Sequence, residues 1–186
     1  IRVLDRSRRD RGLGKGVKQG RVWAYVSDQR PWAGTAPPGV VYRFSPDRKG
    51  EHPQRHLKGS GGILQADAYA GFNQFYEMRA DGSSQFHEAA CWAHLRRDFH
   101  DVWEATKSEI AREALDRIGK LYDLERQIAG QPAELRKAAR QQHSKPKVDA
   151  FKAWAEFQLA RIPGKGDLAK AFRYGPSRWP SFERYL

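Results

Sequence analysis

The chain has 186 residues, enough for one ordinary domain but not for two independent ones. Lys and Arg number 34 against 22 Asp and Glu, a formal net charge of +12. Such an excess favours a polyanionic partner, either nucleic acid or an anionic membrane surface. No apolar run approaches the roughly 20 residues of a spanning helix, and the basic first segment does not resemble a secretory signal. A single cysteine, Cys91, excludes an internal disulfide and predicts a cytoplasmic location.

Both ends of the sequence lack the features of a natural terminus. The chain begins at Ile1, and its one methionine is Met78. The stretch 178–186 is apolar-periodic and stops without a helix-ending signal. We therefore expect the chain to be a fragment of a longer protein.

The first 21 residues form the most basic segment. They hold eight basic residues against two acidic ones, a net charge of +6, and the glycines among them predict a flexible arm over residues 1–20. Two interpretations stay open: a solvated loop, or an arm that lies on phosphates. The candidate DNA contacts in the arm are Arg6, Arg8, Arg9, Arg11, Lys15 and Lys18.

Strand patterns follow the arm. Residues 21–26 and 40–44 alternate and are rich in β-formers, which predicts a hairpin with a long connection. A short helix is expected over 51–58. Residues 61–67 resemble a short buried strand, and 86–92 predict another strand that leads into a helix from His94.

The hydrophobic period becomes helical near residue 104. Apolar residues then recur at steps of three and four, and Thr106 with Glu109 fits a capping box. Further helices are expected over 132–142, over the stretch that ends at Pro163, and from Asp167 with an interruption at Gly175. The pattern predicts an α/β fold, with a mixed sheet over 20–103 whose interior contains strand 63–66, and mainly helices over 104–162.

Asp67 is the carboxylate best placed for chemistry, because it follows an apolar strand directly. A strand end holds a side chain rigidly, which metal-dependent phosphoryl transfer requires. An aspartate in this position is also typical of a turn or a helix cap, so the pattern alone leaves both roles open.

A second string, Cys91-Trp92-Ala93-His94, has a zinc-like Cys-x-x-His spacing. Zinc needs two more ligands and there is no second cysteine, so we favour a structural role, with Cys91 buried, Trp92 in the core and His94 hydrogen-bonded. Arg96 and Arg97 follow one helical turn later. They suit a phosphate clamp and equally suit an ordinary helix surface.

Two strings carry a family resemblance: residues 64–72, which contain Asp67, and residues 91–99, which contain Cys-Trp-Ala-His-x-Arg-Arg-x-Phe. With 45–52 and 178–186, they make the chain resemble the insertion sequence 66 family of bacterial transposases from Gly20 onward. The resemblance implies a ribonuclease-H-like fold with an acidic triad that binds two Mg²⁺. It makes Asp67 the second acid, with the first Asp on a strand just before Ile1 and the Glu on a helix just after Leu186.

On this resemblance, the expected layout is a basic arm over 1–20, a ribonuclease-H-like core over 21–103, a helical insertion over 104–165, and the start of the C-terminal helical part of the core over 166–186. The core is then incomplete at both ends. The family implies an uninterrupted helix in this region, and the sequence departs from that pattern at Gly175-Pro176-Ser177.

The implied function is DNA cleavage and strand transfer, with transposon ends and target DNA as partners and a homo-oligomer in the intact protein. This chain alone is expected to be inactive, because one carboxylate cannot hold two Mg²⁺ against water. Two alternatives stay open: a non-catalytic transposase remnant, and a basic DNA- or RNA-binding module that works without metal.

Overall fold

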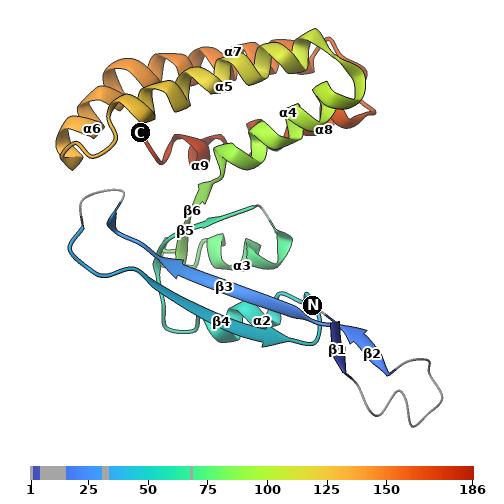
Figure 1. Ribbon diagram of the computed structural model, residues 1–186, viewed down its shortest axis with the longest axis vertical. Coiled ribbons are helices and arrows are strands. Elements are labelled where there is room, and N and C mark those ends of the chain that lie inside the picture. The colour runs from blue at the N-terminus through green and yellow to red at the C-terminus, as the bar shows by residue number, and fades with distance from the viewer. Residues whose placement is uncertain (1, 5–15, 31–33, 68) are drawn as a thin grey trace. The chain divides into compact units, whose positions relative to one another are not determined.

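The computed structural model describes residues 2–4, 16–30, 34–67 and 69–186, and they form a mixed α/β protein (Figure 1). The chain divides into two compact units. The first contains the described residues up to Gly62 together with 69–86, and the second contains 63–67 and 87–186. No helix in the described ranges is long and apolar enough to cross a lipid bilayer.

The first unit begins with a short ladder in which β1 (Arg2–Leu4) pairs antiparallel with β2 (Val17–Gln19). The prediction of a flexible arm over residues 1–20 is therefore wrong for these two stretches, whose backbone groups pair with each other. Arg6, Arg8, Arg9, Arg11 and Lys15 lie outside the described residues, whereas Lys18 lies in β2.

The predicted hairpin is confirmed by the antiparallel pairing of β3 (Arg21–Ser27) with β4 (Gly39–Ser45). Side chains alternate between the two faces of such a ladder. Trp23 lies on the face where its ring packs against Tyr69 and Phe72, with centroids 5.9 and 6.1 Å away. The register pairs Val22 with Phe44, Ala24 with Tyr42 and Val26 with Val40, so these six residues share the opposite face.

Three short helices complete the first unit. The helix expected near 51–58 is confirmed as α2 (Glu51–His56), and η2 (Ala70–Phe72) leads into α3 (Asn73–Tyr76). Phe75 is 2% exposed, and its ring contacts Phe72 and Phe86. This row of aromatic rings is the small core of the unit.

Strand β5 (Gly62–Ala66) pairs with β6 (Phe86–Ala90) in a ladder of two strands. The predicted strands are present, but the prediction that 63–66 lies inside one mixed sheet is wrong. The described residues form three separate two-stranded ladders, so β5 is an edge strand, and Ile63 is 65% exposed. The apolar run Ile63-Leu64 fits a buried interior strand as well as an exposed edge strand. Which of the two it forms depends on neighbouring strands that the local sequence does not encode.

Helices dominate from residue 92 onward, and no described residue after Ala90 belongs to a strand, as predicted. Residue 104, where the inserted helical segment was expected to begin, lies inside the first of these helices. The helices are α4 (Trp92–Thr106), α5 (Glu109–Gln127), α6 (Ala133–Ala139), η3 (Arg140–Ser144), α7 (Lys145–Leu159), α8 (Asp167–Tyr174), η4 (Pro176–Arg178) and α9 (Trp179–Glu183).

The helices bury one stripe each in a common core. Apolar residues on α4, α5 and α7 recur at the three- and four-residue steps that place side chains on one helix face. Phe99, Ile118 and Val148 are fully buried, and Phe172 and Phe182 join them from α8 and α9. Burial of such large side chains is worth roughly 1.5–3 kcal/mol each.

The boundary between α4 and α5 differs from the predicted capping box. Ser108 is the N-cap of α5, and its side chain accepts a hydrogen bond from the amide of Ala111. Thr106 instead closes α4, where its hydroxyl donates to the carbonyl of Val102. The box prediction is wrong because Lys107 takes a left-handed conformation (φ 52°), which ends α4 two residues before α5 begins.

Candidate functional site

Asp67 follows the last residue of β5, as the sequence predicts, and its side chain is exposed. Within the described part of the chain, no three His, Cys, Asp or Glu side chains gather closely enough to hold a metal ion. Mg²⁺ needs several oxygen ligands to replace its water. The described residues therefore do not form a magnesium site by themselves, and Asp67 contributes at most one ligand to such a site.

The Cys91-to-His94 string forms the start of α4. Cys91 is the N-cap of α4, and the Trp92 indole donates to the carbonyl of Phe182 at 3.1 Å. The Trp92 and Phe182 rings meet edge to face at 4.9 Å. His94 lies against the ring of Tyr174, with its Nε2 3.9 Å from Asp98. The favoured structural interpretation is thus confirmed for Trp92, which packs against the core, whereas Cys91 is only partly buried.

Arg96 and Arg97 extend from α4 with exposed side chains. Their exposure is compatible with contacts to phosphates, as the sequence suggested. Lys18 is half-buried in β2. The remaining arm residues proposed to contact DNA lie outside the described ranges.

The resemblance string 45–52 meets residues 69–72, the end of the string 64–72, within the first unit. A Cβ atom added at Gly50 would lie 3.0 Å from the carbonyl oxygen of Gly71, so a side chain there would crowd the backbone. The guanidinium of Arg48 lies 4.3 Å from the centroid of the Tyr69 ring, within the range of a cation–π contact.

The other two strings, 91–99 and 178–186, meet in the second unit. Besides the Trp92 contacts, Glu88 of β6 binds this last segment. Its carboxylate accepts hydrogen bonds from Arg178 and from the Ser181 hydroxyl (2.9 Å). Its carbonyl accepts from Arg184 at 2.7 Å. Sequence reasoning missed this contact, because Glu88 and Arg178 are 90 positions apart.

A hydrogen-bond network runs through the loop after β4. The Trp23 indole donates to Ser45 Oγ at 2.7 Å, and Ser45 donates to the carbonyl of Asp47 at 2.5 Å. Asp47 Oδ1 accepts from the Lys49 amide at 3.0 Å and from His52 Nε2 at 2.6 Å. These bonds, the Lys49 amide first, hold the pKa of the Asp47 carboxyl below its ordinary value.

His52 is 5% exposed and links this loop to α2. Its Nδ1 lies 3.2 Å from a guanidinium nitrogen of Arg55. Its two ring nitrogens therefore face Asp47 on one side and Arg55 on the other. The network contacts Arg55 through His52, and its one signal in the sequence is the Ser-Pro-Asp turn that ends β4.

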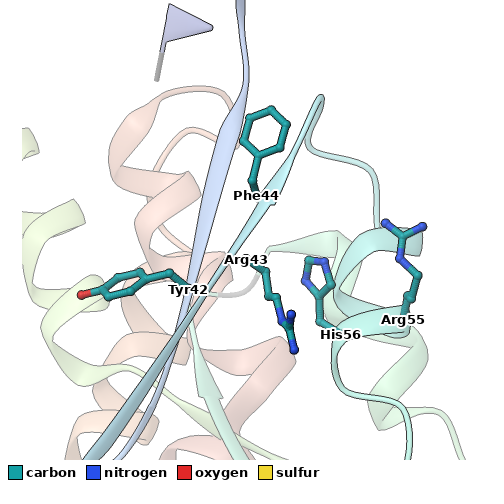
Figure 2. A pocket seen from close by; sticks show the side chains of 5 residues that line it. All are labelled: Tyr42, Arg43, Phe44, Arg55 and His56. Carbon is teal, nitrogen blue, oxygen red and sulfur yellow. The ribbon is translucent and has the colours of Figure 1, made fainter.

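An open pocket of about 540 Å³ lies beside this network, between β4 and α2 (Figure 2). Its lining residues are Tyr42, Arg43, Phe44, Arg55 and His56. Figure 2 shows Arg43 extending from β4 on the side of His56, with Tyr42 on the other side of the strand. Sequence reasoning did not single out any of these five residues.

His56 also contacts Tyr25 of β3, whose hydroxyl lies 3.0 Å from its Nδ1. Burial raises the pKa of Tyr25 to about 12, so it stays neutral. Burial is also the largest cause of the lowered pKa of His56, followed by the nearby charges of Arg55, Arg43 and His52. The pocket therefore has a positive potential.

The chain matches a known family over its full length. The family model described as Transposase IS66 family covers residues 1–186. Three uncharacterized proteins of Sinorhizobium fredii, y4hP, y4qI and y4jD, are 40%, 39% and 37% identical to the chain over 179, 178 and 173 residues. The matches cover 90%, 94% and 92% of this chain and 32%, 33% and 34% of those proteins.

The chain therefore spans about a third of the length of the curated relatives it matches. No solved structure matches it. The structure therefore shows a mixed α/β protein without a known structural relative, and the family assignment rests on the match to the family model. Because that match extends from the first residue to the last, the chain belongs to the IS66 family of transposases.

Proposed function

We propose that this chain is the central part of a transposase catalytic domain, which cleaves DNA at transposon ends and joins them to target DNA. Family membership over residues 1–186 is the observation that carries the proposal. The rest of the domain, including two further acids, would come from parts of the longer protein outside this chain. Its relatives, three times as long as the matched region, leave ample length for them.

In this proposal Asp67 is one of three acids of the active site. Its place directly after β5 supports the role, because a backbone held in a ladder fixes the carboxylate position, and its exposure leaves the oxygens accessible. Mg²⁺, bound by the three acids together, would supply the charge that stabilises phosphodiester cleavage.

The proposed fold of the intact domain is ribonuclease-H-like. The β5–β6 ladder supports it, since both strands keep one unpaired edge within the described residues. An additional strand from the longer protein would give β5 the interior position that it lacks here.

The isolated chain is expected to bind DNA without cleaving it. A charge of +12 supports binding through phosphates, while the described residues do not assemble a metal site. This behaviour also fits the second candidate, a basic nucleic-acid-binding module that works without metal. The two candidates differ in what the longer protein does.

The decisive experiment compares the longer protein with its Asp67→Asn variant on supercoiled plasmid that carries the element's ends. Loss of one anionic metal ligand should lower Mg²⁺-dependent cleavage by more than about 100-fold. The matched control is Asp101→Asn, since Asp101 is a 73% exposed carboxylate on α4 and should leave activity unchanged. Cleavage that survives Asp67→Asn would contradict the assignment, and no cleavage by any longer protein would favour the binding module.

A further inference from the structure

The pocket between β4 and α2 is lined by both cationic and aromatic side chains. Arg43 and Arg55 approach it from different elements, with His56 between them (Figure 2). None of its five lining residues is acidic. In the neighbouring network, the Asp47 carboxylate is already bonded to His52 and to the Lys49 amide. Arg55 contacts His52 through one guanidinium nitrogen, so its other N–H groups and those of Arg43 can donate to an anion such as a phosphodiester.

Two aromatic residues of β4, Tyr42 and Phe44, also border the pocket, although they lie on the face of the ladder opposite to Arg43. Tyr42 is 66% exposed and Phe44 is 51% exposed, although both belong to the paired part of β4. They share their face with Val22, Val26 and Val40, which are 48%, 71% and 49% exposed. This face of the hairpin carries no charged side chain, so it offers ring and aliphatic surface directly beside the cationic pocket.

Phosphates alone do not explain this arrangement. A DNA duplex presents its backbone to a protein and keeps its bases stacked on each other, so exposed rings gain little from it. An unpaired strand presents both a phosphate and a free base face, and stacking on aromatic side chains is a main source of affinity for single strands. The alternation of β4 places Arg43 on one face and the rings of Tyr42 and Phe44 on the other, so a strand that crosses the β4 edge would contact both.

We propose that the β3–β4 hairpin binds an unpaired DNA strand, with bases stacked on Tyr42 and Phe44 and a backbone phosphate held by Arg43 and Arg55. This inference rests on the proposed function for its choice of DNA, and it adds the strandedness of the substrate and the residues that recognise it. Opened strands occur wherever a transposase has cut or frayed a DNA end.

Binding is measured with the full 186-residue chain in chelator, without divalent metal, so that catalysis plays no part. The probes are a labelled oligonucleotide of about 12 nucleotides, the corresponding duplex and the same sequence as RNA, followed by fluorescence anisotropy. Tyr42→Ala and Phe44→Ala should each weaken single-strand binding by about 5- to 150-fold and change duplex binding less than twofold. Tyr42→Phe keeps the ring and should retain the affinity.

The charge contacts have a separate readout. Arg43→Gln with Arg55→Gln should lower the slope of log K against log salt by about 1.4 for the single strand, because two counterions fewer are released. The control pair, Lys120→Gln with Lys137→Gln, removes two exposed positive charges from α5 and α6 and should leave the slope nearly unchanged. Phe157→Ala is the matched ring control, since Phe157 is 54% exposed on α7.

Circular dichroism of each variant shows whether it is folded, and the hairpin rings are exposed enough for truncation to leave the core intact. Equal weakening of single-strand and duplex binding by Tyr42→Ala and Phe44→Ala would overturn the stacking role. Unchanged single-strand binding in these variants would do the same. Clearly tighter binding of the RNA strand would overturn the choice of DNA. Failure of the Asp67→Asn experiment would leave all these outcomes unaffected, because none of them involves cleavage.

Discussion

The contact between Glu88 and the last segment of the chain offers a quantitative test of what holds the second unit together. Glu88→Ala removes the acceptor for Arg178 and for Ser181, while the bond from Arg184 to the backbone carbonyl remains. The side chains of Glu88 and Arg178 are 15% and 20% exposed, so water replaces their partners only in part.

Two hydrogen bonds to a charged group are worth about 1.5–3 kcal/mol each when fully buried. Loss of a buried partner costs about 3–5 kcal/mol, much of it because the remaining charge is left unpaired. Because Arg178 keeps a fifth of its side-chain surface in water, the lower end applies. We expect Glu88→Ala to lower the free energy of unfolding by about 2–3 kcal/mol, or the midpoint temperature by about 4–12 °C.

The assay is urea unfolding followed by near-ultraviolet circular dichroism, which reports the packing of Trp92 and Trp179. Glu88→Gln keeps the shape and one acceptor, so it should cost about half as much. The control is Glu113→Ala, which breaks an ion pair with Arg117 on the surface of α5, where such pairs contribute about 0.3–0.5 kcal/mol. If Glu88→Ala costs no more than Glu113→Ala, the contact does not stabilise the unit and the reasoning fails.

Two further changes test the turn and cap assignments. Ser108→Ala should lower the free energy of unfolding by about 1 kcal/mol, because it removes the N-cap of α5, whereas Thr106→Ala should leave it nearly unchanged. If thermal unfolding shows the larger loss for Thr106→Ala, the capping box predicted from the sequence is right. Asp47→Asn should remove an acid-sensitive contribution to stability. Bonds led by the Lys49 amide depress the pKa of Asp47 in the fold, so its stabilisation is complete above about pH 4 and declines as pH falls through the folded pKa. The measurement is the denaturant midpoint of wild type and variant at several pH values. A parallel decline of the two midpoints below about pH 4 would contradict the prediction.

Local pattern predicted most of the secondary structure. The alternation of 21–26 and 40–44 and the helical period after residue 104 depend on side-chain spacing within one element, and β3, β4, α5 and α7 confirm them. Pattern failed where structure depends on partners. Ile63 is apolar and follows two glycines, yet it lies on an edge strand, because the number of strands in a sheet is not encoded in any one of them.

The candidate site divides in the same way. Asp67 was found because a carboxylate after a strand is a local signal, and its position is confirmed, while its catalytic role stays a prediction. The cationic pocket was missed, because Arg43 and His56 come from a strand and a helix and are ordinary surface residues when considered separately. The Glu88–Arg178 contact joins residues 90 positions apart, beyond the reach of any sequence window.

The titration of His56 gives a last test of the pocket. The groups that face it are Arg55 and His52 on α2, Arg43 on β4 and the neutral hydroxyl of Tyr25 on β3. Burial and these positive charges lower its pKa below 6.5 in the free chain, and a bound phosphate would raise it again by supplying negative charge. Binding then takes up a proton, so single-strand affinity should rise as pH falls from about 8 to about 5, by at most about tenfold per pH unit, and level off below the pKa of the free chain. His56→Gln should flatten this rise, and His143→Gln, at an exposed site in η3, should not. If the affinity of His56→Gln rises as steeply as that of the wild type, the titrating group is not His56, and the proposal that a phosphate binds beside His56 is wrong.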